Sequence, residues 1–208
     1  MLRCRIHWCA RNTQHEALGG LSDKLRTMRK LILIKHAKPE IVPAIPSDQW
    51  RLGAEGRAAC GPLSNKLKPF APAAIHTSVE PKARETAELI GQALGVPVHS
   101  ADNLHEHDRS NEPHMDTREF ISLMALLFKE PDRQVLGLET ANEAFTRFAG
   151  AVDKILATTI GDQAIVSHGT VIALFAQRRL KKDGFALWRQ MGQPSFLVID
   201  ADNWSVIG

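Results

Sequence analysis

A chain of 208 residues, 44% hydrophobic and 24% charged, is long enough to bury a sizeable core in a single α/β domain. Its formal net charge of +3 arises in the first 30 residues, which hold seven Lys/Arg and two Asp/Glu, since the remainder holds 19 basic and 21 acidic residues. The composition therefore argues against a nucleic-acid partner, and no apolar run approaches the ~20 residues that a membrane span needs.

Residues 1–28 are expected to form a poorly ordered N-terminal extension, followed by one domain over residues 29–208. The extension is interrupted by Gly19-Gly20 and lacks the apolar core of a secretory signal. A disordered tail, an organelle-targeting peptide and the product of an upstream start codon all remain open for it. The last reading rests on Met28, which directly precedes the first expected strand.

The three cysteines, Cys4, Cys9 and Cys60, do not suggest a disulfide framework. Their number is odd, and two of them lie in the N-terminal extension. This usage fits a reducing compartment, so we expect a cytoplasmic protein.

Between residues 31 and 208, apolar strand-like runs alternate with helical stretches. Pro81 and Gly95, for example, suit the first turn and the end of one helix. In chain order we expect strand 31–35, helix 53–67, strand 73–77, helix 81–94, strand 96–100, helices 117–129 and 140–158, strand 163–167, helix 169–180, and strands 195–200 and 204–207. Such alternation predicts an α/β fold with a mostly parallel central sheet covered by helices on both faces.

Two of these strands end on a histidine. The apolar run 31–34 leads through Lys35 into His36, and the run 163–167 leads into His168. Ligands of open α/β sheets bind at the carboxyl edge, where an imidazole can act as nucleophile, acid–base catalyst or metal ligand. We therefore expect the two histidines to share one composite site. Two hydrogen-bonded structural histidines are the alternative.

Several groups near these histidines favour an anion. Gly169 opens a helix directly after His168, and a helix N-terminus attracts negative charge. Lys35 stands beside the first histidine, and Lys82 with Arg84 opens another helix. Together they predict a phosphate pocket.

The polar loop 102–116 offers further chemistry. Glu106 is its candidate general acid, because the other candidates include no proton donor. His105, His107 and His114 could instead bind zinc, although their spacing is a weak signal and a solvated loop explains it as well. Neither of the glycine-rich nucleotide motifs GxGxxG and GxxxxGK[ST] occurs in the chain.

These motifs resemble those of the histidine phosphatase superfamily, the phosphoglycerate mutase-like proteins. Lys35-His36-Ala37 stands where members carry Arg-His-Gly, and residues 77–87 follow a Thr-Ser-x-x-x-Arg-Ala-x-x-Thr-Ala pattern. The Leu-x-Glu and Ser-His-Gly elements correspond to residues 104–106 and 167–169, and Leu138-Glu139-Thr140 with Arg147 echoes a Gly-Glu-Ser element and its later arginine. The motifs occur in family order over residues 29–208.

The resemblance implies a three-layer α/β/α sandwich and a metal-independent phosphomonoester hydrolase without a cofactor. His36 would take up the phosphoryl group, while Lys35, Lys82 and His168 surround its oxygens. Glu106 would protonate the leaving alcohol and later activate water. The expected partner is a small phosphorylated substrate, with a phosphoprotein possible, and the oligomeric state stays open.

The chain departs from the family pattern at three positions. Both motif arginines are lysines, Lys35 and Lys82, and the glycine after the nucleophile is Ala37. An ammonium keeps the positive charge but loses the planar two-point grip of a guanidinium. A catalytically weak or inactive phospho-ligand-binding protein of the same fold is therefore the main alternative, and a metal-dependent hydrolase is a third.

Overall fold

The alternation of side chains along the first strand builds both cores of the molecule. Strand β1 (Lys30–Lys35) directs Leu31 and Leu33 into one hydrophobic cluster, and Ile32 and Ile34 into another. Successive side chains of a strand point to opposite faces of the sheet, so a run of four buried residues requires a layer on each side.

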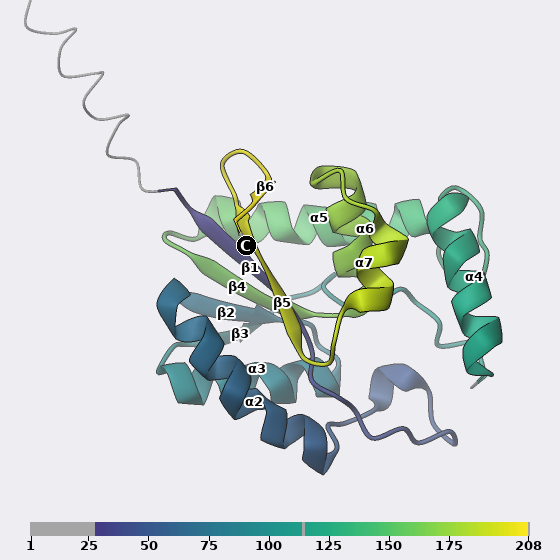
Figure 1. Ribbon diagram of the computed structural model, residues 1–208, viewed down its shortest axis with the longest axis horizontal. Coiled ribbons are helices and arrows are strands. Elements are labelled where there is room, and N and C mark those ends of the chain that lie inside the picture. The colour runs from purple at the N-terminus through teal and green to yellow at the C-terminus, as the bar shows by residue number, and fades with distance from the viewer. Residues whose placement is uncertain (1–27, 114, 208) are drawn as a thin grey trace, which may run out of the picture.

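The computed structural model describes residues 28–113 and 115–207 (Figure 1). The remaining strands are β2 (Ala74–Thr77), β3 (Val98–Ser100), β4 (Gln163–Ser167), β5 (Ser195–Asp200) and β6 (Ser205–Val206). The α-helices are α2 (Ala54–Leu67), α3 (Pro81–Leu94), α4 (Thr117–Lys129), α5 (Ala141–Thr158), α6 (Gly169–Arg179) and α7 (Gly184–Gln190). Two short 3₁₀ helices are η1 (Ser47–Gln49) and η2 (Lys68–Phe70).

The six strands form one sheet in the order β3-β2-β4-β1-β5-β6. The first four of this order pair in parallel, whereas β5 and β6 are antiparallel to their neighbours. The expected mostly parallel sheet is confirmed. In the pairing of β1 with β4, Lys35 lies opposite Ser167, so both strands end at the same level of the carboxyl edge.

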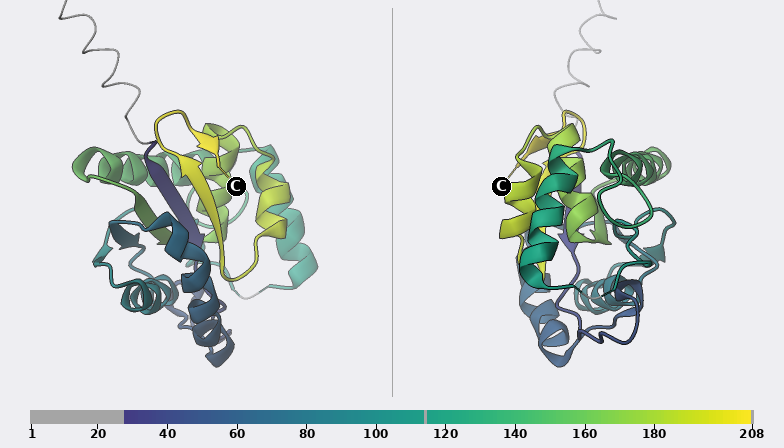
Figure 2. Two further views of the ribbon diagram at one scale, coloured as in Figure 1. Left: turned by 60° about the vertical axis from the view of Figure 1, so that its left-hand side comes forward. Right: turned by 90° about the vertical axis from the view of Figure 1, so that its right-hand side faces the viewer.

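Helices cover both faces of the sheet, which confirms the three-layer sandwich. Helices α2 and α3 pack on the face of Ile32 and Ile34, and α4, α5, α6 and α7 contribute to the opposite cluster. The views of Figure 2 show the two groups of helices on either side of the strands. Within the part of the chain that the structure describes, no helix is long and apolar enough to cross a membrane.

The predicted strands and α-helices agree closely with the observed ones, with two exceptions. Strand β3 begins at Val98 and not at residue 96, because Pro97 has no N–H to give to the strand ladder. Helix α7 was not predicted, although Asp183 accepts a hydrogen bond from Ala186 N as its N-cap. The expected extension lies outside the described residues as far as residue 27.

Candidate functional site

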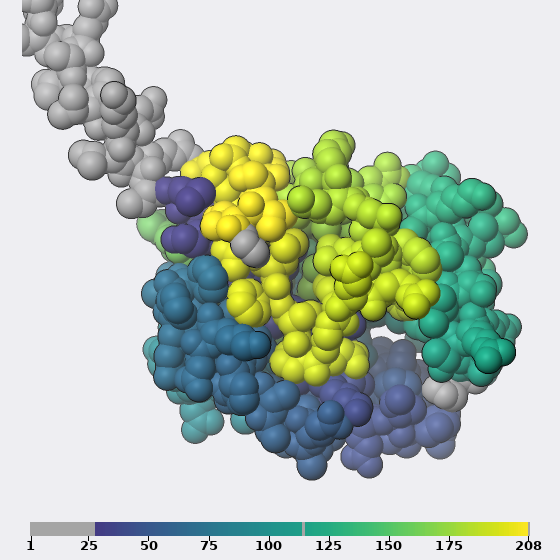
Figure 3. Space-filling view, in the orientation of Figure 1, coloured from purple at the N-terminus to yellow at the C-terminus, as the bar shows by residue number. Residues whose placement is uncertain are grey.

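The ends of β1 and β4 bring His36 and His168 together. The backbone N–H of His36 donates to the Ser167 carbonyl at 2.9 Å, which continues the pairing of the strands by one residue. The ring centroids of the two histidines lie 5.1 Å apart, with the planes at 60°. Both side chains are buried. In Figure 3 the surface is hollowed beside this edge, between α7, α4 and the loop after β1.

A backbone contact fixes the proton of His36. Its Nδ1 lies 2.7 Å from the Ala37 carbonyl, which can only accept, so Nδ1 carries the hydrogen and Nε2 keeps its lone pair. Burial and the nearby Lys82 lower the pKa of His36 to about 4. The ring is therefore neutral near pH 7 and can act as a nucleophile through Nε2.

His168 is held on one side of its ring. Its Nε2 lies 2.9 Å from Ser78 Oγ and 3.3 Å from Glu80 Oε1. Its Nδ1 has no hydrogen-bond partner among the described residues. Burial, followed by the charge of Lys82, lowers the pKa of His168 well below its usual value, so this ring is also neutral.

Lys35 reaches past the start of α6. Its Nζ donates to the Met191 carbonyl at 3.2 Å, and burial lowers its pKa while the charge of Glu106 opposes the shift. A Cβ at Gly169 would lie only 3.3 Å from this Nζ. Gly169 therefore leaves the ammonium space against the first turn of α6.

Lys82 is buried at the start of α3 and is held by two acceptors. Its Nζ donates to Glu80 Oε2 at 2.6 Å and to the Ser47 carbonyl at 2.5 Å. Both side chains of the Lys82–Glu80 pair are almost fully buried, with 6% and 7% of their surface exposed. We call Lys35, His36, Lys82 and His168 the basic cluster.

The carboxylate of Glu106 accepts hydrogen bonds at the N-terminus of α6, which is the helix end that we expected to hold an anion. Its oxygens accept from the backbone N–H groups of His107 at 2.9 Å, Thr170 at 3.2 Å and Val171 at 3.3 Å. Burial alone would raise its pKa, but Arg109 and these donors outweigh burial and hold the pKa far below its usual range. Glu106 is therefore ionised in the unliganded site.

The turn that carries Glu106 is fixed by α5. Arg147 donates to the carbonyls of Asn103, His105 and Glu106, and its guanidinium pairs with Glu139 at 2.6 Å. The Leu-Glu-Thr element and Arg147 thus hold the Glu106 loop in place and do not form part of the basic cluster.

The histidines of the loop do not assemble a metal site within the described residues. No group of three His, Cys, Asp or Glu side chains there could hold an ion. His107 Nε2 bonds instead to the Glu139 carbonyl at 2.8 Å, and His105 is half-buried. His114 lies outside the described residues.

The structure does not bring Arg84 into the site. Its side chain is 55% exposed and pairs with Glu88 on the same helix at 3.8 Å. Residues two apart on a helix are separated by about 200°, so Arg84 turns away when Lys82 points inward. The predicted helical start was right, but its two basic residues cannot share one anion.

The sequence matches the histidine phosphatase superfamily (branch 1) over residues 31–206. The chain belongs to this superfamily. No curated protein matches the chain in sequence.

Solved structures of the same fold are distant in sequence. A mycobacterial glucosyl-3-phosphoglycerate phosphatase is similar with a TM-score of 0.70 and 18% identity, over 86% of this chain and 95% of that one. Bacillus stearothermophilus YhfR gives 0.66 and 22%, over 86% and 94%. A phosphoserine phosphatase of Entamoeba histolytica, in complex with 3-phosphoglyceric acid, gives 0.68 and 18%, over 86% and 94%. At these identities the likeness shows the fold.

Glu80 is a charged residue of the candidate site that sequence reasoning missed. It falls on one of the open positions of the Thr-Ser-x-x-x-Arg motif, which say nothing about the side chain. The available signal was its place between a strand end and a helix start, two residues before Lys82. The structure turns this carboxylate inward, where it contacts Lys82 and His168.

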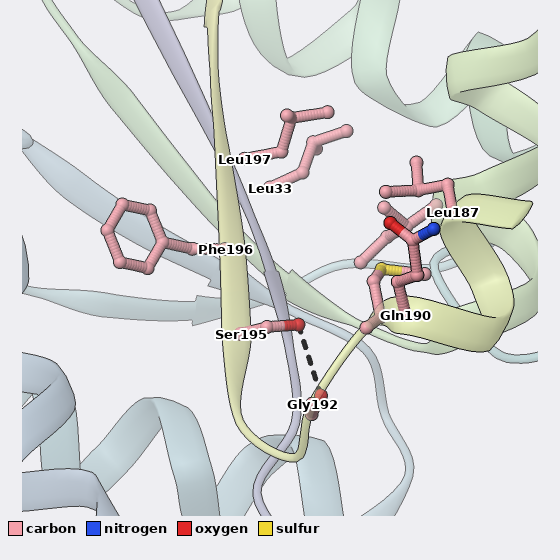
Figure 4. A pocket seen from close by; sticks show the side chains of 9 residues that line it. Leu33, Leu187, Gln190, Gly192, Ser195, Phe196 and Leu197 are labelled. Atoms are coloured by element: carbon pink, nitrogen blue, oxygen red, sulfur yellow. Dashed lines mark hydrogen bonds between the residues drawn. The ribbon is translucent and has the colours of Figure 1, made fainter. Parts of the chain in front are cut away.

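An apolar cavity of about 190 Å³ lies next to the basic cluster, between β5 and α7 (Figure 4). Its lining includes Leu33, Leu187 and Met191, and the carbonyl of Met191 is the acceptor of Lys35. No side chain of the basic cluster lines this cavity. The apolar cavity is therefore distinct from the group of basic and acidic side chains at the sheet edge.

Proposed function

We propose that this protein is a metal-independent phosphomonoester hydrolase that forms a phosphohistidine on His36. The observation that carries the proposal is the buried His36–His168 pair, with ring centroids 5.1 Å apart and the Nε2 lone pair of His36 free to attack. Lys35 and Lys82 supply positive charge in the same cluster, as a phosphoryl group in transfer requires.

The chemistry would proceed in two steps. Nε2 of His36 attacks phosphorus, so that the N–P bond forms and the ester P–O bond breaks with its electron pair on the leaving oxygen. Glu106 passes a proton to that oxygen. In the second step Glu106 takes a proton from water, the water oxygen bonds to phosphorus, and the N–P electron pair returns to His36. Glu106 then gives this proton up as the product phosphate leaves, which restores the ionised carboxylate.

The resting charge of Glu106 adds a condition to this mechanism. The carboxylate is ionised because Arg109 and backbone donors hold its pKa low. The proton for the leaving alcohol must therefore arrive with the substrate and pass through Glu106.

Small phosphorylated molecules are the substrates we infer. Related solved structures are described as complexes with inorganic phosphate, phosphoserine and 3-phosphoglyceric acid. A phosphorylated protein side chain remains an alternative for the same site.

A phospho-ligand-binding protein without turnover is the second candidate, and one observation favours it. Each ammonium of the basic cluster already has an internal acceptor, Met191 O for Lys35, and both Glu80 and Ser47 O for Lys82. A site built in this way could bind phosphate yet stabilise the transition state weakly.

Hydrolysis of an aryl phosphate, with and without a chelator, separates these candidates. We expect chelator-resistant turnover that His36→Ala abolishes, together with an acid-labile phosphoryl label on the native chain only. His99→Ala, which removes an exposed histidine on β3, is the matched control and should retain full activity. Turnover that survives His36→Ala would exclude His36 as the nucleophile, and binding of phosphate without turnover would favour the second candidate.

A further inference from the structure

A buried carboxylate inside a site for anions requires an explanation. Glu80 is 7% exposed, and its Oε2 accepts from Lys82 Nζ at 2.6 Å. Its Oε1 accepts from the backbone N–H of Glu106 at 2.7 Å and lies 3.3 Å from His168 Nε2. Three groups that would otherwise face a bound oxyanion are thus in contact with a negative charge of the protein itself.

Glu80 changes the charge of the pocket. Lys35 and Lys82 bring two positive charges, and both histidine rings are neutral because burial lowers their pKa values. Arg109 and Glu106, 3.8 Å apart, offset one another. With Glu80 ionised against Lys82, one positive charge is left for the ligand.

We propose that Glu80 makes this site selective for singly charged phosphoryl groups, so that a phosphomonoester binds in its singly protonated form in preference to the dianion. The proposal rests on the phosphoryl-transfer function argued above and adds the charge state of its substrate. Glu80 repels a dianion about twice as strongly as a monoanion, and burial leaves this repulsion weakly screened. A monoanion balances the one remaining positive charge, whereas a dianion would leave a net negative charge in a buried pocket and costs more to remove from water.

A further feature of the site fits a ligand that carries a proton. Glu106 is ionised at rest and needs a proton before it can protonate a leaving alcohol. A singly protonated phosphoryl group supplies that proton.

Two variants of Glu80 separate the effect of its charge on ligand binding from a purely structural role. Glu80→Gln keeps an oxygen for the Glu106 N–H and nearly the same shape, but removes the charge. Glu80→Asp keeps the charge on a shorter side chain. Glu88→Gln is the matched control. Glu88 lies on the exposed side of α3, the helix that begins directly after Glu80, and it pairs only with Arg84 among the contacts described.

Perrhenate and tungstate test the proposal directly, because they are tetrahedral oxyanions of similar size with one and two permanent negative charges. Their affinities for the full chain would be measured by calorimetry, at fixed ionic strength and a mildly alkaline pH. We expect the native protein to bind perrhenate at least as tightly as tungstate. Glu80→Gln should raise the affinity for tungstate relative to perrhenate by about tenfold or more, whereas Glu80→Asp and Glu88→Gln should leave the ratio unchanged.

Each other outcome overturns a defined claim. A native preference for tungstate contradicts the inference even if no Glu80 variant folds, and so does an unchanged ratio in folded Glu80→Gln. Either result leaves the phosphatase proposal standing, since both anions would still bind. Failure of both anions to bind would overturn the phosphoryl site itself and the inference with it.

Discussion

A lysine holds a phosphate oxygen through one movable ammonium, whereas an arginine grips two oxygens in a fixed plane. Neighbouring acceptors restore part of that fixed geometry in this protein. The Met191 carbonyl orients the ammonium of Lys35, and Glu80 together with the Ser47 carbonyl orients that of Lys82. Hydrogen bonds therefore fix the positions of both ammonium groups, which do not rotate freely.

Removal of Lys35 tests this placement at the scale of one residue. Lys35→Ala should lower kcat/KM for an aryl phosphate by on the order of 10²–10³-fold, the usual effect of losing one transition-state donor. Lys38→Ala is the matched control, because Lys38 is exposed and pairs with Glu55 at 2.7 Å. A loss below about threefold in Lys35→Ala would remove this ammonium from the transition state.

At the scale of the element, helix α5 supports the site through its first turn. Thr140 and Glu143 form a capping box, in which Thr140 Oγ1 accepts from Glu143 N at 3.1 Å and Glu143 Oε2 accepts from Thr140 N at 2.8 Å. The residue before this cap, Glu139, pairs with Arg147, which holds the Glu106 loop. The cap thus fixes the start of the helix that carries Arg147.

Loss of this cap should destabilise the fold by a measurable amount. Thr140→Ala should lower the free energy of unfolding by about 1 kcal/mol, because the N–H of Glu143 loses its acceptor. Urea denaturation monitored by circular dichroism measures the change. Thr146→Ala is the control, since Thr146 bonds within the helix to Asn142 O and should change the free energy by less than about 0.5 kcal/mol. Equal losses in the two variants would argue against the cap.

The sequence contained enough local information to predict most of the elements. Helix 81–94 was predicted to the residue, because Pro81 begins it and Gly95, with a φ of 69°, ends it. Helix α7 escaped prediction because it has only seven residues and its apolar residues are consecutive, at 185–188, so no helical periodicity marks it. Local signals of caps and periodicity therefore account for both the success and the failure.

The site was less predictable than the fold. Strand-end position was enough to bring His36 and His168 together, because parallel strands share one carboxyl edge. The outward direction of Arg84 follows from its spacing of two residues from Lys82 once the segment is helical. Whether Glu80 turns inward depends on packing between α3 and the loops around it, and neither its residue type nor its spacing indicates that orientation.

At the scale of the whole molecule, buried imidazoles link the stability of the fold to pH. Burial is the largest cause of a lowered pKa for each of five histidines: His36, His76, His105, His107 and His168. A group whose pKa is lower in the folded chain binds fewer protons there than in the unfolded chain. Unfolding then takes up protons, so stability increases as pH rises between the two pKa values.

For His36, the pH range over which stability rises runs from about 4 to the ordinary pKa of 6.5. For the other four histidines the corresponding pH range ends at the same upper value. The free energy of unfolding should therefore rise from pH 5 to pH 7, with at most about 1.4 kcal/mol per pH unit from each imidazole. Urea denaturation at several pH values measures this slope. His76→Gln removes one buried imidazole outside the basic cluster and should reduce the slope, whereas Thr146→Ala at an exposed position without a titrating group should preserve it. A stability that is constant or falls between pH 5 and pH 7 would contradict neutral burial of these rings.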